Sequence, residues 1–477
     1  MSDMSYTGRD VVAIRRSLVD MIPKLTDKWK DFNESDLGMI ILELIAGAQD
    51  MQNFYFDAQA FETYLDTAVQ EKNIRSLLRA MNYRIPLIGP AKGSVRVKYK
   101  TDEPKKAIFP KYTQFECSSS KIKYVASDTV YANTVDGYID IPVMEGEYKE
   151  KKITKREIAS NVTSSGKVSR RIYLGYSTVA DRSVEICQDG VIWEEVDDAL
   201  LEYNGGYVFS VHKDSNNQVY LLMSVNFMDL LPVNEEEEIV IKFVISCGRS
   251  GVVKAGEIDS IIDGKISLTG ITDCYNLVDT YGAWDEVDLQ HAKVLARRQA
   301  QTMGRYITLD DYKNGVETEP YIMKCVVHDW RTDESIREPY LVNIWAVDWG
   351  GNSLGEQDKA TLISKLISKG VSDVSVSVKD VEIVPYDIKI KLILKTASES
   401  DSQKVRALVE ENLYEMYKVD NMGFGEEISI SMLNSRVKVM SPYIKEVIIE
   451  SPESDVETSY IQFPKLRDVS VEIIGRV

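Results

Sequence analysis

Apolar positions along the chain follow a helical period near the N-terminus and a strand period further on. Apolar residues recur three or four positions apart up to about residue 85, which indicates helices. The stretch YRIPLIGPAKG (residues 83–93) carries two prolines and two glycines and marks a boundary. Between residues 92 and 247, short alternating runs such as SVRVKYK and IVIKFVIS predict strands. The C-terminal third alternates strand and helix, which predicts two small α+β units.

These patterns predict an α+β protein of several domains. We expect an N-terminal helical segment (1–88), a β-rich domain (89–247), a strand–turn and two-helix region (248–335) and C-terminal α+β domains (336–477). In the third of these, Asp285 is expected to cap a helix that runs through Met303. Thr308 and Asp311 have the spacing of a capping box at the start of the next helix.

One stretch near the N-terminus, DLGMIILELIAGAQDMQNFYFDAQAFETYL (residues 36–65), is unusually apolar. Asn33 is the expected N-cap of its helix, which could continue beyond Leu65 because no Gly or Pro interrupts it before Pro86. The longest apolar run, Gly38–Ala48, is interrupted by Glu43 and is shorter than the roughly 20 residues that cross a bilayer, so a membrane span is excluded.

The apolar residues of this helix follow coiled-coil spacing. Steps of four and three alternate along the seam Ile40, Leu44, Gly47, Met51, Phe54, Ala58, Phe61 and Leu65. A flank makes the stripe wider than a two-stranded seam requires, and it consists of Leu37, Ile41, Ile45, Ala48 and Tyr55. Periodicity alone leaves two interpretations open. The helix is either part of a helical core formed within this chain or part of a bundle shared with other chains.

Composition and charge narrow the range of partners. With 44% hydrophobic and 28% charged residues, the chain has the composition of an ordinary globular protein. A net charge of −18 argues against nucleic acid as the main partner. Residues 92–172 hold 17 Lys and Arg against 10 Asp and Glu, whereas residues 181–238 hold 2 against 14. The two stretches are either solvated loops or complementary faces of neighbouring subunits.

The sequence lacks the motifs of common catalytic and metal sites. The three histidines, His212, His291 and His328, have no second ligand at metal-binding spacing, and the five cysteines are far apart. GRSGVVKAGEI (248–258) has no phosphate-binding Gly-Lys-Ser/Thr ending, and neither a Gly-x-Ser-x-Gly nor a His-Glu-x-x-His motif occurs. We therefore expect no cofactor, no metal and no enzymatic activity, although a pair of carboxylates in a glycosidase has no sequence signature.

Several segments, in a shared order, resemble the baseplate J-like family, the wedge proteins of contractile phage tails and related injection systems. The N-terminal helices are similar in their Asp36-Leu37-Gly38 start and their Asn82-Tyr83 turn. AIFPKYTQFEC (107–117) and GRSGVVKAGEI resemble two further family segments. The closest similarity lies in YGAWDEVDLQHAKVLARRQAQTMGRYITLDDY, through Gly282, Asp285, Arg297, Arg305, Thr308, Asp311 and Tyr312.

This resemblance implies a structural wedge subunit in the baseplate of a virion tail or tail-like particle, assembled in the host cytoplasm. Such a subunit joins a second copy of itself, a partner wedge protein, and the hub and sheath-initiating proteins. The resemblance also favours the inter-chain bundle, in which the eight seam residues bind partner helices. Two alternatives remain: a tail protein that binds a receptor or cell-wall glycan, suggested by the β-rich middle and 26 tyrosines, and a carbohydrate-degrading enzyme with an acidic pair.

Overall fold

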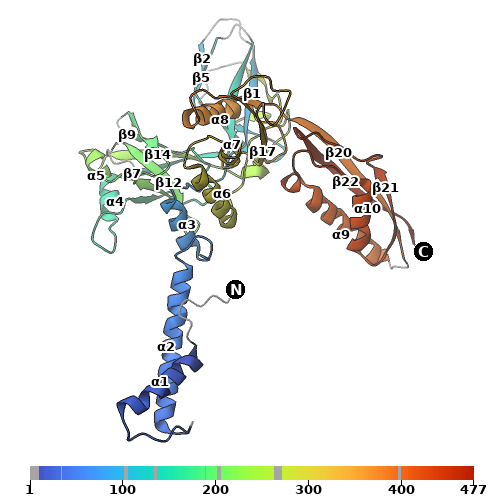
Figure 1. The fold of residues 1–477 in the computed structure, drawn as a ribbon. Helices are drawn as coiled ribbons and strands as arrows, with labels where there is room; N and C mark the ends of the chain where they lie inside the picture. The colour runs from blue at the N-terminus through green and yellow to red at the C-terminus, as the bar shows by residue number, and fades with distance from the viewer. Residues whose placement is uncertain are drawn as a thin grey trace. The chain divides into compact units, whose positions relative to one another are not determined.

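The computed structural model describes residues 10–33, 35–100, 106–133, 137–188, 190–200, 206–262, 271–395 and 399–476 (Figure 1). Contacts divide the chain into two units. The helical unit comprises Met1–Ile85 with Leu289–Lys293, and the main unit comprises Pro86–Asp288 with Val294–Val477. Helices near the N-terminus, sheets in the middle and a mixed C-terminal region confirm the α+β multidomain class.

The helical unit contains α1 (Val11–Leu25), α2 (Leu37–Phe61) and α3 (Glu71–Ala80). Asp10 caps α1 by accepting a hydrogen bond from the backbone N–H of Ala13 at 2.7 Å. α1 packs against α2. Ile14 and Ile22 are the buried residues of α1, and Met39 and Ala46 are those of α2. This pairing therefore covers only a small part of α2.

The start of α2 differs from the sequence expectation. Its N-cap is Asp36, not Asn33, and the Asp36 carboxylate accepts from the N–H of Gly38 at 3.0 Å. Asn33 instead accepts from the N–H of Ser35 within the preceding turn. The indole ring of Trp29 lies so close to Gly38 that a Cβ there would be 2.3 Å from Trp29 Cζ2. The Asp-x-Gly start is thus a cap combined with a close aromatic contact.

This contact gives a testable difference between the two glycines of α2. Gly38→Ala is expected to displace Trp29 and destabilise the start of α2 by about 1–2 kcal/mol, because the new methyl group overlaps the ring. Gly47→Ala is the control, since nothing lies within 4 Å of its Cβ position and alanine favours a helix by about 1 kcal/mol. Amide hydrogen exchange of residues 37–46 in the full chain should quicken in the first variant and slow in the second. Equal exchange in both would contradict the proposed Trp29 contact.

α2 ends at Phe61 and does not continue beyond Leu65. The hydroxyl groups of Thr63 and Thr67 donate to the carbonyl oxygens of Ala60 and Phe61, at 2.5 and 2.6 Å. These bonds satisfy carbonyls at the helix end and turn the chain away from the helix axis. The Glu62 carboxylate then accepts from the backbone N–H groups of Val69 and Gln70, which lead into α3.

The main unit begins with a six-stranded sheet in the order β15-β3-β4-β6-β1-β16. Its strands are β1 (Lys92–Tyr99), β3 (Gln114–Glu116), β4 (Lys123–Ala126), β6 (Tyr138–Glu145), β15 (Ser260–Ile261) and β16 (Ile271–Asn276). A two-stranded sheet pairs β2 (Lys106–Phe109) with β5 (Val130–Asn133). Alternate residues of β1 and β6, among them Val95, Val97 and Ile141, form the buried core of this part.

Two four-stranded sheets lie between β6 and β15 in the sequence. The first, β10-β9-β14-β7, contains β7 (Glu147–Thr154), β9 (Glu185–Gln188), β10 (Val191–Ile192) and β14 (Glu238–Ile245). The second, β11-β12-β13-β8, contains β8 (Arg171–Tyr173), β11 (Glu194–Glu195), β12 (Val208–Lys213) and β13 (Val219–Met223). The short helices α4 (Lys155–Ser160) and α5 (Phe227–Leu230) accompany them. Both sheets contribute to one core, which includes Phe209, Leu221 and Phe243.

The next part of the chain holds the two helices anticipated from their caps. It contains the 3₁₀ turn η1 (Gly248–Gly251), α6 (Leu289–Thr302), α7 (Leu309–Glu317), β17 (Lys324–His328), β18 (Leu341–Val347), α8 (Glu356–Lys369) and β19 (Ser375–Lys379). The capping box of Thr308 and Asp311 is confirmed. Asp285 does not cap α6, which begins at Leu289; its carboxylate accepts from the backbone N–H of Arg249 at 3.1 Å.

The C-terminal part is a three-stranded sheet with helices packed on it. It comprises β20 (Glu382–Leu394), α9 (Glu399–Tyr417), the 3₁₀ turn η2 (Val419–Asn421), α10 (Ile430–Met440), β21 (Ile444–Ser451) and β22 (Gln462–Arg476). β20 pairs antiparallel with β21 and parallel with β22. α9 contacts β22 and α10 contacts β21, and Leu392, Leu413 and Leu433 are fully buried between helices and sheet.

Candidate assembly interface

Most of the predicted seam lies on the surface of α2. Leu44, Met51 and Phe54 are 69%, 61% and 68% exposed, and Ile40 is exposed as well. Gly47, Ala58 and Phe61 are half-buried. Leu65 is half-buried and lies beyond the end of α2, so it does not extend the helical seam. Seven of the eight predicted residues therefore share one helix, and four of them are open to solvent.

The flank of the seam is exposed too. Leu37 is 71% exposed, and Ile41, Ile45, Ala48 and Tyr55 are also exposed. Sequence reasoning missed Phe56, an exposed residue outside both the seam and the flank. A signal for it was present, because Phe54, Tyr55 and Phe56 are consecutive and therefore point in three directions around a helix.

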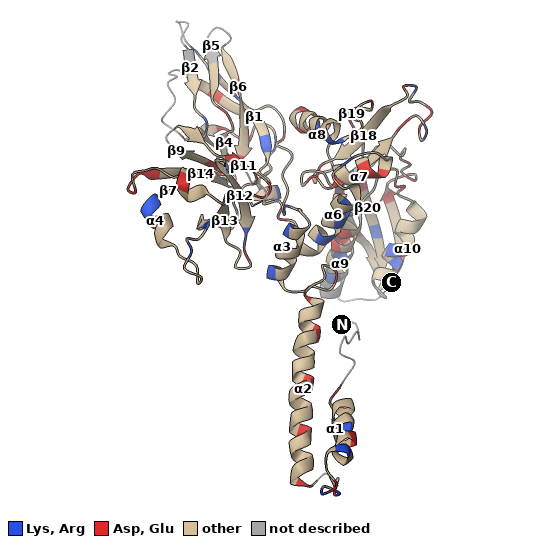
Figure 2. Cartoon of the chain, turned by 60° about the vertical axis from the view of Figure 1, so that its left-hand side comes forward, with Lys and Arg blue, Asp and Glu red and all other residues tan. Residues whose placement is uncertain are grey.

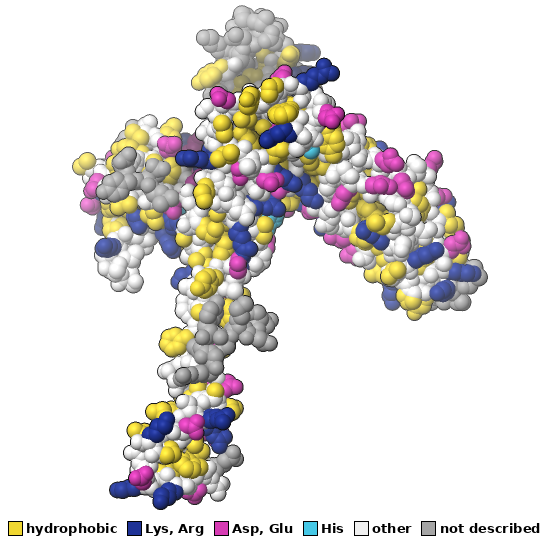
Figure 3. All heavy atoms as spheres, in the orientation of Figure 1, with side chains coloured by type: hydrophobic (Ala, Val, Ile, Leu, Met, Phe, Trp, Pro, Cys, Tyr) yellow, Lys and Arg dark blue, Asp and Glu magenta, His cyan; other side chains and the backbone are white. Residues whose placement is uncertain are grey.

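The apolar surface of α2 is unusual for a helix that packs only within its own chain. An isolated exposed leucine needs no explanation, but a helix that is apolar on most sides is normally buried. Met39 and Ala46, one heptad apart, mark the face that α1 covers. Figure 3 shows apolar side chains at the surface of the helical unit. The geometry suits a helix that receives further helices along the seam and its flank.

α1 also carries exposed apolar residues. Val12 and Leu25 are more than 70% exposed and Met21 is also exposed, whereas Ile14 and Ile22 face the interior. Arg15 on α1 forms an ion pair with Glu43 on α2, with 3.8 Å between Nη1 and Oε1. Besides this internal contact, both helices therefore expose apolar side chains.

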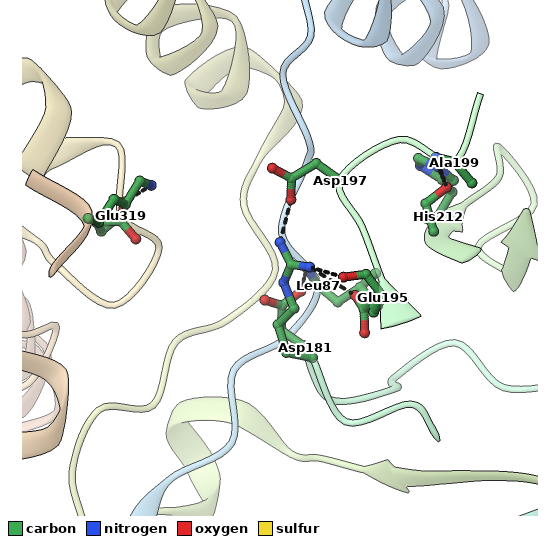
Figure 4. A network of polar contacts seen from close by, with 10 residues as sticks. Leu87, Asp181, Glu195, Asp197, Ala199, His212 and Glu319 are labelled. Atoms are coloured by element: carbon green, nitrogen blue, oxygen red, sulfur yellow. Dashed lines mark hydrogen bonds and ion pairs between the residues drawn. The ribbon is translucent and has the colours of Figure 1, made fainter. Parts of the chain in front are cut away.

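The two stretches of opposite charge in the main unit pair partly with each other. Lys152 contacts Glu238 and Arg156 contacts Glu236, both at 2.9 Å. Within the acidic stretch itself, Arg182 forms ion pairs with Asp197 and, at 3.7 Å, with Glu195, two residues that are labelled in Figure 4. Nearby, Asp181 accepts from the N–H of Leu87 at 3.0 Å. Partners within the same chain thus account for part of the charge asymmetry, without a second subunit.

Groups that could carry chemistry are dispersed. Within the described residues, no group of three or more His, Cys, Asp and Glu side chains converges as a metal site would. His212 Nε2 lies 2.8 Å from the hydroxyl of Ser210, and His328 Nδ1 lies 3.2 Å from that of Thr332. Among the described helices, none has both the length and the apolarity of a membrane span.

Comparisons with known proteins locate the similarity in the helical unit. Residues 11–80 match the family described as the N-terminal domain of bacteriophage baseplate proteins. That match leaves out residues 248–330, where the sequence motifs also resemble baseplate proteins. No curated protein matches the chain.

A solved structure of the anti-feeding prophage baseplate, determined by cryo-electron microscopy with six-fold symmetry, is 11% identical. The alignment covers 95% of this chain and 90% of that one, with a TM-score of 0.33, which is too low to establish a shared fold. Over the residues that build α1, α2 and α3, the chain is therefore similar to bacteriophage baseplate proteins, as its sequence predicted.

Proposed function

We propose that this chain is a wedge subunit in the baseplate of a contractile phage tail or a related injection particle. The observation that carries the proposal is the exposed apolar surface of α2, in the segment that matches baseplate proteins. In this proposal α2 enters a helical bundle with α2 of a second copy and a helix of a partner wedge protein. The wedges form a ring around the hub and contact the sheath-initiating proteins, and assembly takes place in the host cytoplasm.

The width of the apolar surface supports more than one neighbouring helix. A two-stranded coiled coil buries two columns of residues, which the seam supplies. Ile41, Ala48 and Tyr55 form a third exposed column, at spacings of seven. A bundle of three or more helices buries three adjacent columns and also leaves α1 on its own face of α2. Burial of a large apolar side chain such as that of Ile41 contributes about 1.5–3 kcal/mol to the stability of the bundle.

The proposed role is mechanical and involves no catalysis. Subunit interfaces hold the ring in one arrangement before host contact and favour another afterwards, which permits sheath contraction. Contacts that differ between the two arrangements determine which one is populated. The bundle would hold the subunits together while the domains of the main unit change neighbours.

Co-expression with the neighbouring tail proteins tests this role. The full chain is expected to elute with a partner wedge protein in size-exclusion chromatography. Mass measurement is expected to give two copies of this chain per complex. A chain that remains a stable monomer and joins no particle would contradict the proposal.

A further inference from the structure

Acidic residues run along one side of the α2 seam at a strict interval. Glu43, Asp50 and Asp57 are each seven positions apart and share one column of the helix, and the N-cap Asp36 precedes Glu43 by the same interval. Each lies four positions before a seam residue, namely Ile40, Gly47, Phe54 and Phe61, and residues so spaced are neighbours on a helix surface. α2 itself contains no Lys or Arg (Figure 2). We call these four residues the acidic column.

The contact that α1 makes shows what kind of residue this column accepts. α1 brings the guanidinium of Arg15 to Glu43 at 3.8 Å. Asp50, one heptad further along, is half-buried and has no ion-pair partner among the described residues. Asp36 is already used as the N-cap of α2. A helix packed along the seam would bring its own flanking residues beside Glu43, Asp50 and Asp57, where charge sets the choice of partner.

A second copy of α2 has no complementary charge to offer at this place. In an antiparallel pair, the acidic columns of the two copies would face each other, which is unfavourable. In a parallel pair, the column would face the apolar flank of Ile41, Ala48 and Tyr55. Neither arrangement supplies a positive charge from α2.

We propose that the helix docked beside the acidic column belongs to a different protein and carries Lys or Arg next to its own apolar seam. This inference rests on the proposed function, because it names the chemistry of one partner at the same surface. The second copy of α2 then occupies the other side of the seam, along the apolar flank.

The test uses the full chain and two synthetic amphipathic helical peptides as probes. The peptides share one leucine seam and differ only in their flanking positions, which are all Lys in one and all Glu in the other. The Lys peptide is expected to bind at least about tenfold more tightly at low salt, because the column attracts its flanking charges and repels those of the Glu peptide. Higher salt should reduce this preference. Fluorescence anisotropy measures both affinities.

Charge reversal of the column identifies where the preference arises. The triple variant Glu43→Lys, Asp50→Lys and Asp57→Lys is expected to prefer the Glu peptide, with Asp36 retained as the cap. The matched control, Gln49→Lys, Gln52→Lys and Gln59→Lys, adds positive charge to α2 outside the column and should keep the preference for the Lys peptide. A control that reverses the preference as well would overturn the inference.

Two further outcomes separate this inference from the proposed function. The chain carries a net charge of −18, so the Lys peptide must lose its affinity in Met51→Asp, which damages the seam and spares the column. Undiminished binding to that variant would show attraction to the net charge and overturn the inference. Equal binding of both peptides to the native chain would also overturn it, while assembly blocked by Met51→Asp would still support the proposed function.

Discussion

Met51→Asp or Phe54→Asp on α2 is expected to block assembly and to leave the main unit folded. Both side chains are more than 60% exposed in the chain alone, so a carboxylate at either position meets water and costs the folded monomer little. In a bundle the same carboxylate would be buried without a partner. Its desolvation, together with the lost packing, should cost at least about 4 kcal/mol, or a thousandfold in affinity.

Gln49→Asp is the matched control for these variants. Gln49 is exposed on α2 outside the seam and its flank, so the substitution adds the same charge to the same helix. It should leave assembly with co-expressed tail proteins unchanged, as measured by size-exclusion chromatography and mass. Thermal unfolding of the main unit should be the same in all three variants. If Met51→Asp unfolded the whole chain, α2 would be an internal core and the interface would be refuted.

Elements whose signals are local could be predicted from the sequence. The capping box of Thr308 and Asp311 needs only residues three positions apart, and it forms as expected. The seam on α2 also follows from spacing within one helix. The end of α2 could not be predicted, because it depends on Thr63 and Thr67 bonding to carbonyls rather than on a glycine or proline.

Elements that depend on distant residues were predicted wrongly. Asp285 is of a residue type that often caps helices. Its carboxylate instead accepts a hydrogen bond from the backbone N–H of Arg249, which is far away in the sequence. Pro385 lies inside β20, although proline is seldom found within a sheet. The reason is topological: β21 pairs with β20 only from Lys389 onward, so Pro385 stands where β20 has a neighbour on one side.

Identifying the candidate interface required both the spacing of residues in the sequence and their exposure in the structure. Spacing gave the residues of the seam but left open whether another part of the chain covered them. The exposure of Leu44, Met51 and Phe54 favours packing against other chains, because a core formed within this chain would have buried these side chains. The two stretches of opposite charge are weaker evidence for a subunit interface, because Lys152 and Arg156 form ion pairs with acidic residues of the same chain.

Gly89→Ala is expected to destabilise the main unit by about 3 kcal/mol or more, a large effect for one methyl group. A Cβ on Gly89 would lie 2.0 Å from Trp284 Cδ2, in the middle of a buried indole ring. The ring has little freedom to move away. Its Nε1–H donates to the carbonyl of Leu87 at 2.8 Å, and the backbone N–H of Gly89 donates to the carbonyl of Trp284 at 2.9 Å. Thermal unfolding of the full chain measures the loss.

Two further variants decide whether the overlap with the indole is the cause. Gly206→Ala is the control, because the nearest atom to its Cβ position is Val208 Cγ1 at 4.0 Å, and it should leave the free energy of unfolding nearly unchanged. Trp284→Ala alone should cost about 3–5 kcal/mol through the cavity it leaves. In the double variant the alanine methyl group at position 89 meets no indole. The loss in free energy of unfolding should therefore be clearly smaller than the sum of the losses in the two single variants. Additive losses would show that Gly89 matters for its backbone conformation and not for the space it leaves to Trp284.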